Sequence, residues 1–357
     1  MFLYEKFNTI PQMIKMGDES IINKLKNGII KPYQFYNTQL SASDSNWIRI
    51  REDFNFSKSV GKRLNKTYYD IETYVKVDST LTPFTAQYSY YPINACAHYN
   101  NIKNKAFIPF LRHPNHSKWS DSELTELVKD AYLKLCENNN TYKVDDIDIS
   151  VVGFDTENKL LTWCFESFKN LNHHILMGFN SQTFDDPYII KRLKKANEAN
   201  WESIISEFSQ VRSFGELSFE FPDYNLADLL VMYKPVDSGG DGMGKSLPDY
   251  TLNTIALTVL GIKKLDLDED FIYSYENNII NYLLYNLLDV LLTFKLDDKL
   301  KFLEQIFALA EINNSPLGST IRGRSLMFSA RNNSHFMREG KILRDGKFST
   351  EVIFKTD

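Results

Sequence analysis

The sequence has few cysteines, no paired cysteine motif and no excess of positive charge. Cys96, Cys136 and Cys164 are the three cysteines among 357 residues, and they are widely spaced. This pattern argues against a disulfide framework and a cysteine zinc site, and it fits a reducing compartment. The formal net charge of −5 excludes a basic field over the whole molecule. Any nucleic acid must therefore be bound through local patches or bound metal.

Long hydrophobic runs are also absent. The N-terminus, MFLYEKFNTI, has no basic stretch followed by an apolar one, so no secretion signal is predicted. The most apolar segment, residues 279–294, is interrupted by Asn281, Asn286 and Asp289 and is too short and too polar to span a bilayer. Hydrophobic residues make up 43% of the chain, which excludes wholesale disorder. The length predicts two domains, or one large domain with additions.

The residue pattern predicts mixed strands and helices without regular alternation. Residues 66–77 are rich in β-branched and aromatic side chains and predict a strand. Residues 120–137 predict an amphipathic helix, and residues 277–300 a longer helix that is apolar nearly all round and therefore buried. The other expected elements are hairpin-like stretches near residues 88–109, a hairpin over 147–168 with its turn at 157–159, a strand ending near Phe179, a helix capped by Asp186, a strand over 226–233 and a short helix over 252–260.

The first predicted strand carries two acidic residues. Asp70 and Glu72 are two apart, so on a strand both point to the same face. Their neighbours Tyr69 and Ile71 suit a buried setting, where two like charges repel and are costly to desolvate. A divalent cation would resolve that conflict. The alternative is a solvent-facing pair on an edge strand.

Two further aspartates stand at notable positions. Asp289 lies in the middle of the apolar helix, four residues after Tyr285 and on the same helix face. A carboxylate there needs a cation or several hydrogen-bond donors, unless it lies on the helix surface. Asp185 lies where a strand ends and the next helix begins. If the following residue caps that helix, Asp185 is free to face a cleft.

Together these segments resemble the proofreading 3′→5′ exonuclease domain of family B DNA polymerases. YYDIET at residues 68–73 resembles the first exonuclease motif, GFNSQTFD at 178–185 the second, and YNLLD at 285–289 the third. Each motif alone is loose, but the three occur in order, on fitting elements and at spacings similar to those of T-even-like phage polymerases. The resemblance covers residues 66–300. It implies an α/β, ribonuclease H-like exonuclease fold with a mixed central sheet, plus a small N-terminal domain.

The resemblance also implies a chemistry. Two Mg²⁺ or Mn²⁺ ions would be held by Asp70, Glu72, Asp185 and Asp289, with Asp70 bridging both ions and Tyr285 orienting the attacking water. No His-x-x-x-x-Asp pattern occurs near Asp289, so the sequence resembles the tyrosine type of the four-carboxylate exonucleases. The implied reaction releases nucleoside 5′-monophosphates from a 3′ end of DNA.

Substrate contacts follow from the same resemblance. Asn180 and Phe184 would position the terminal nucleotides of a single-stranded or frayed 3′ end, where stacking requires no particular base sequence. Lys191 and Arg192 would guide the DNA backbone, although the basic run to which they belong could equally be a solvated helix face. Family B palm motifs of the types Asp-x-x-Ser-Leu-Tyr and Tyr-x-Asp-Thr-Asp are absent from the sequence. We therefore expect a polymerase palm as a separate polypeptide or as a C-terminal continuation.

The resemblance predicts three parts of the chain. These are an N-terminal domain at residues 1–65, the exonuclease domain at 66–310 and a segment at 311–357 that packs back on the N-terminal domain or leads to a palm. The expected setting is the cytoplasm of an infected host cell, in viral replication and without membrane contact. Two other functions stay open: a standalone exonuclease that also acts on RNA, and a polymerase-associated DNA-binding module without turnover.

Two competing motifs are set aside. Asp155 and Glu157 form a second Asp-x-Glu pair, but the predicted turn would expose Glu157 at a hairpin tip. Residues 239–246, GGDGMGKS, match the phosphate-loop pattern. However, Pro248 follows closely and would break a helix that starts at Lys245. A loop near DNA is the interpretation we prefer there.

Overall fold

The computed structural model describes most of the chain between residues 65 and 312. The described residues are 65–74, 89–138, 140–171, 173, 175–196, 200–205, 211–213, 219–220, 225–237, 247–267 and 270–312. The chain divides into two compact units, Ser59–Gln305 and the combination of Met1–Lys58 with Ile306–Asp357. The central sheet and the candidate site described below lie in the unit Ser59–Gln305. The predicted N-terminal domain, C-terminal segment and 239–246 loop lie almost wholly outside the described residues.

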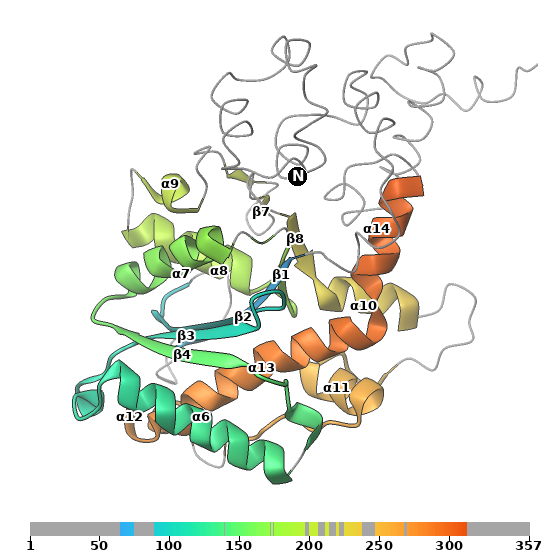
Figure 1. The fold of residues 1–357 in the computed structure, drawn as a ribbon. Coiled ribbons are helices and arrows are strands. Elements are labelled where there is room, and N and C mark those ends of the chain that lie inside the picture. Colours follow the sequence, from blue (N-terminus) through green and yellow to red (C-terminus); the bar gives the residue numbers. More distant parts are fainter. Residues whose placement is uncertain are drawn as a thin grey trace, which may run out of the picture. The chain divides into compact units, whose positions relative to one another are not determined.

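A six-stranded mixed sheet forms the centre of the first unit (Figure 1). Its strands, in spatial order, are β4 (Asp148–Phe154), β3 (Lys105–Leu111), β2 (Ile93–Asn100), β1 (Lys66–Thr73), β5 (Ile175–Gly178) and β8 (Asn225–Asp228). The pairs β1–β2 and β2–β3 are antiparallel, and the other three pairs are parallel. The predicted mixed α/β fold is therefore confirmed. A separate small ladder joins β6 (Arg212–Ser213) to β7 (Phe219–Glu220).

Strand β1 divides its side chains between two helical layers. Tyr69 and Ile71 are buried in a core cluster with residues of α7 (Glu157–Leu171) and α8 (Asp185–Ala196). Tyr68, on the opposite face, contacts Phe294 of α13 (Ile279–Leu300), with ring centroids 5.4 Å apart. Because side chains alternate along a strand, Asp70 and Glu72 point with Tyr68 toward α13.

Helices cover both faces of the sheet (Figure 1). The α7–α8 layer lies on one face, and α13 lies on the other, where it packs against β1, β2 and β3. Helices α6 (Asp121–Asn138), α11 (Leu252–Leu260) and α12 (Phe271–Asn277) contact α13. The other helical segments of the described residues are η3 (Pro114–His116), η4 (Asn140–Tyr142), α9 (Trp201–Ile205), α10 (Leu229–Asp237) and α14 (Phe302–Ile312).

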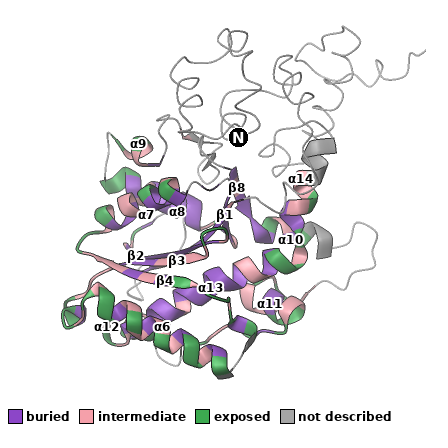
Figure 2. Ribbon diagram, viewed as in Figure 1, coloured by how far each residue is buried: buried purple, intermediate pink, exposed green. Residues whose placement is uncertain are grey.

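Helix α13 is the buried core helix that its composition predicts (Figure 2). Among the described residues, it is the one helix long and apolar enough to cross a membrane, with a mean hydropathy of 1.4. However, 72% of the window that meets this criterion is buried inside the protein. Burial by the sheet and neighbouring helices accounts for the apolar composition, since core helices share it.

Several helix boundaries agree with the sequence analysis. Ser120 and Glu123 form reciprocal hydrogen bonds at the start of α6, which is a capping box. Thr251 caps α11, and Gly261 ends it with φ 71°, a left-handed conformation that glycine adopts without steric cost.

The predicted hairpin over residues 147–168 is wrong. Strand β4 is correct, but α7 begins at Glu157, where the turn was expected. The buried residues of this segment repeat with a helical spacing, which stabilises a helix on the sheet rather than a second strand. The buried apolar residues of α7 include Leu160, Leu161, Cys164, Phe165 and Phe168.

Two other local predictions also need correction. The strand expected over residues 226–233 ends at Asp228, and α10 begins at the next residue. Helix α8 begins at Asp185, one residue earlier than the cap predicted at Asp186. The carboxylate of Asp186 instead accepts a hydrogen bond from the hydroxyl of Tyr69.

Candidate metal centre

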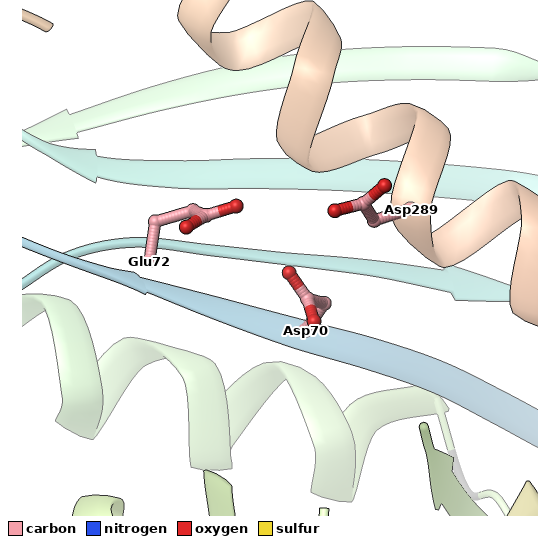
Figure 3. Close-up of side chains that lie close together, drawn as sticks. All are labelled: Asp70, Glu72 and Asp289. Carbon is pink, nitrogen blue, oxygen red and sulfur yellow. The ribbon is translucent and has the colours of Figure 1, made fainter. Parts of the chain in front are cut away.

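Three carboxylates meet between β1 and α13 (Figure 3). Asp70 and Glu72 extend from β1 and Asp289 from α13, and one oxygen atom from each lies within 4.8 Å of the others. The alternation of β1 places its two acids on one face, and the packing of α13 on that face brings the third. The structure thus gathers three of the four carboxylates named in the sequence analysis.

Burial raises the pKa of all three carboxylates, and repulsion by neighbouring acids adds to the rise at Asp70 and Glu72. Desolvation is the largest cause for Asp70 and Glu72, followed by the charges of neighbouring acids. Desolvation also raises the pKa of Asp289 to about 6, although Lys264 opposes the rise. One oxygen of Asp289 is buried without a hydrogen-bond partner. A divalent cation would supply both the missing charge and the missing partner, and hard oxygen ligands suit Mg²⁺ and Mn²⁺.

Asp185 lies next to this cluster but outside it. Its side chain is buried at the start of α8, and its Oδ1 accepts a hydrogen bond of 3.1 Å from the backbone N–H of Ile71. Burial, followed by the charge of Asp185, raises the pKa of Asp70, so the two carboxylates are electrostatically coupled. Ile71 lies between Asp70 and Glu72 in β1, so this hydrogen bond fixes Asp185 beside the strand that carries both acids.

Lys264 is a site residue that the sequence analysis missed. Its ammonium lies 2.7 Å from Oδ2 of Asp289 and 4.4 Å from the ring centroid of Tyr285. Burial lowers the pKa of Lys264, but the carboxylate of Asp289 and the hydroxyl of Tyr285 together raise it above its ordinary value, so the ammonium stays charged. Burial raises the pKa of Tyr285, which keeps its phenol protonated.

No sequence signal distinguished Lys264 from its neighbour. Lys263 precedes it directly but points to solvent, with 69% of its side chain exposed, and pairs with Asp266. The two lysines differ only in the folded protein, where the segment after α11 packs on α13 and places Lys264 against Asp289.

Without metal ions, the stability of the protein should fall as the pH rises. Asp70, Glu72 and Asp289 have raised pKa values in the folded state, so the folded protein binds protons more tightly than the unfolded chain. This contribution is fully present below the unfolded pKa values of about 4 and is lost as the pH rises through the folded values. We expect a lower melting temperature in EDTA at pH 8 than at pH 5.5, measured against the Asp70→Asn, Glu72→Gln variant. Parallel pH profiles for the two proteins would contradict the prediction.

Hydrogen bonds tether the loop between β5 and α8 to Asp228. This loop carries Asn180, whose φ is 62°, and Phe184, whose ring lies 5.4 Å from that of Tyr188. The carboxylate of Asp228 accepts hydrogen bonds from the backbone N–H groups of Asn180 (2.9 Å) and Gln182 (3.1 Å). This buried acid is a second residue that the sequence analysis missed, because its role depends on β8 lying beside β5.

Replacing Asp228 by asparagine should loosen this loop. An amide offers one accepting oxygen where the carboxylate has two, so at least one partly buried N–H group would lose its partner. Hydrogen bonds to charged groups contribute about 1.5–3 kcal/mol, and we expect the free energy of unfolding to fall by about 2 kcal/mol in urea melts. Asp155→Asn is the control, since that side chain is 80% exposed. An equally small effect of both substitutions would refute this role.

The basic residues predicted to guide DNA are placed differently from one another. Arg192 forms an ion pair with Glu157, and its side chain is only 11% exposed. It also donates to the backbone carbonyl of Ser89. Arg192 thus makes contacts inside the fold. Lys191, the preceding residue of α8, is half-buried.

The second Asp-x-Glu pair is not a hairpin tip. Glu157 lies at the start of α7, 12% exposed, and accepts a hydrogen bond of 2.7 Å from the backbone N–H of Ile93. Its partner in the motif, Asp155, is exposed and 3.8 Å from Lys159. The expected exposure of Glu157 is thus wrong, but the two side chains do not join the carboxylate cluster.

The mixed sheet, the helices on both of its faces and the buried carboxylates are consistent with an α/β exonuclease domain of the ribonuclease H-like class. Residues 115–237 match the sequence model of the exonuclease domain of DNA polymerase family B. The resemblance inferred from the three motifs is therefore confirmed. Asp185 lies within the matched residues, whereas Asp70, Glu72 and Asp289 lie outside them.

Viral DNA polymerases are similar to this chain. It is 24% identical over 277 residues to the DNA-directed DNA polymerase of Escherichia phage RB69, an alignment that covers 74% of this chain and 29% of the relative. It is 23% identical to the DNA-directed DNA polymerase of Enterobacteria phage T4, in an alignment that covers 71% of this chain and 27% of the relative. It is 28% identical to the DNA polymerase of Orgyia pseudotsugata multicapsid polyhedrosis virus, in an alignment that covers 45% of this chain and 17% of the relative. The chain spans less than a third of the length of these relatives.

Proposed function

We propose that this chain is a metal-dependent 3′→5′ DNA exonuclease that releases nucleoside 5′-monophosphates and proofreads for a family B-like viral DNA polymerase. The observation that carries the proposal is the meeting of Asp70, Glu72 and Asp289, with an unpartnered Asp289 oxygen, in a domain similar to polymerase exonuclease domains. The alignments with the two phage polymerases cover 74% and 71% of this chain, against 45% for the Orgyia virus polymerase, and this longer coverage supports a phage polymerase in the proposal.

The site residues then have distinct roles. Two Mg²⁺ or Mn²⁺ ions, when bound, would neutralise the phosphodiester and activate water for attack in a two-metal reaction. Asp70, Glu72 and Asp289 would hold these ions, and Asp185 would support the site from the start of α8. The burial and the positions of the four carboxylates support these roles. Asp70, Glu72 and Asp289 lie close together, and Asp185 accepts a hydrogen bond from the backbone of β1.

Two neighbouring residues complete the proposed chemistry. Tyr285 remains a neutral phenol because burial raises its pKa, so it can donate a hydrogen bond to the attacking water. Lys264 keeps a positive charge beside Asp289, where negative charge develops on the phosphate. Asn180 and Phe184 would position the last nucleotides of a single-stranded or frayed 3′ end, with Lys191 near the DNA backbone.

The partner and setting follow from the relatives and remain proposals. A polymerase palm, either separate or continuous with this chain, would pass a mispaired 3′ end to the exonuclease. The place of action would then be the cytoplasm of an infected cell. The relatives that support these proposals are much longer than this chain, which spans less than a third of their length.

The test is a digestion of single-stranded DNA labelled at its 5′ end. With Mg²⁺, we expect a ladder that shortens from the 3′ end and releases nucleoside 5′-monophosphates, and none in EDTA. Equal rates on RNA of the same sequence would favour a standalone exonuclease that also acts on RNA. DNA binding without any ladder, even after addition of candidate polymerase partners, would favour a non-catalytic module.

A further inference from the structure

We infer that Asn286 is a positioning residue that orients Asp70 for metal binding, an inference that rests on the proposed function. Asn286 lies on α13 directly after Tyr285 and is completely buried. A polar side chain at this depth must have hydrogen-bond partners, because an unsatisfied buried amide costs about 1–3 kcal/mol. Its partners determine what the residue does.

The amide of Asn286 connects α13 to both central strands. Its Oδ1 accepts a hydrogen bond of 2.8 Å from the backbone N–H of Ala97 in β2. Its Nδ2 donates to Oδ2 of Asp70 at 2.9 Å and lies 3.4 Å from the backbone oxygen of the same residue. Ala97 and Asp70 are directly opposite each other in the antiparallel β1–β2 pair. One side chain therefore fixes a pair of facing strand residues and a carboxylate at once.

The contact with Ala97 settles the orientation of the amide. A backbone N–H can only donate, so the oxygen of Asn286 must face Ala97 and the NH₂ group must face Asp70. Asp70 is thus held by a donor on one of its oxygens.

The hydrogen bond should increase metal affinity. Groups that hydrogen-bond a metal-ligating side chain keep it in its binding orientation, and their loss typically costs about 10–100-fold in affinity. Asn286 meets this description through Asp70. A purely structural amide would do no more than satisfy the N–H group of Ala97. The two roles predict different metal-binding constants.

Direct binding of Mn²⁺ separates the two roles. We would titrate the full chain with Mn²⁺ and follow the free ion by electron paramagnetic resonance, comparing wild type with Asn286→Leu and Asn286→Ala. The leucine variant keeps the branched shape of the side chain, and the alanine variant leaves room for water to reach Ala97 if leucine prevents folding. We expect the dissociation constant to rise about 10–100-fold in each variant that folds.

Asn100→Leu is the matched control. Asn100 is another fully buried asparagine, in β2 three residues from Ala97, and its amide donates to the hydroxyl of Thr67 rather than to a clustered acid. This variant should lose stability yet keep the wild-type Mn²⁺ affinity within about twofold. An unchanged affinity in both folded Asn286 variants, or an equal loss in the control, would overturn the inference. If wild type and the Asp70→Ala, Glu72→Ala variant bind Mn²⁺ equally, the metal centre itself fails, which is a separate result.

Discussion

Replacement of both Asp70 and Glu72 by alanine is expected to abolish exonuclease turnover. The two side chains supply two of the three carboxylates that meet between β1 and α13. Without them the site cannot hold the ions that would activate water and neutralise the phosphate. We expect a loss of about 10⁴-fold or more in kcat on single-stranded DNA, which corresponds to about 5 kcal/mol of transition-state stabilisation.

The folded state of this variant should survive. Removing two neighbouring negative charges relieves repulsion that raises the pKa of each in the metal-free protein. The melting temperature in EDTA should therefore not decrease, since no ion pair among the described residues is lost. A loss of activity would then come from the missing carboxylates and not from unfolding. Asp155→Ala is the control, since it removes an exposed acid from the second Asp-x-Glu pair. Activity that persists without Asp70 and Glu72 but disappears without Asp155 would move the site to the start of α7.

Replacement of Lys264 by methionine should have the second-largest effect. Methionine keeps most of the length of the side chain but removes the ammonium that pairs with Asp289 and lies against Tyr285. Loss of one group that stabilises developing charge typically lowers kcat about 10²–10³-fold, and we expect a loss in this range at saturating Mg²⁺. The measurement is single-turnover digestion, which reports the chemical step rather than product release.

The adjacent lysine provides a control for that experiment. Lys263→Met changes the same side-chain chemistry one residue away, on a side chain that points to solvent and pairs with Asp266. Its rate should stay within about twofold of wild type, as exposed substitutions are usually mild. Similar losses in both variants would mean that a general charge effect, not the contact with Asp289, explains the result.

The carboxylate cluster could be predicted because its main determinants are local. The spacing of Asp70 and Glu72 determines their shared face on a strand, and the apolar run around Asp289 makes that carboxylate conspicuous. The order and spacing of the three motifs then predicted that acids distant in sequence belong to one site. The mixed sheet followed from the same resemblance and is confirmed.

The supporting residues could not be predicted because their roles depend on tertiary contacts. Lys264, Asp228 and Asn286 act through partners on other elements, and nothing in their own neighbourhood marks them. The wrong hairpin has a different cause. A strong strand signal in β4 was extended into residues whose apolar spacing is helical, at Leu160, Cys164 and Phe168. Arg192 was expected to guide the DNA backbone, with a solvated helix face as the alternative, and its ion pair with Glu157 inside the fold could not be read from the run of charges.

The most direct test is to locate manganese in a crystal of this chain with a short single-stranded DNA. A non-hydrolysable 3′-terminal linkage would keep the substrate intact while Mn²⁺ occupies its site. The proposal predicts an anomalous manganese peak between Asp70, Glu72 and Asp289, with the phosphate of the 3′-terminal nucleotide as a further ligand. A 3′ end bound elsewhere, or manganese absent from these carboxylates, would contradict it.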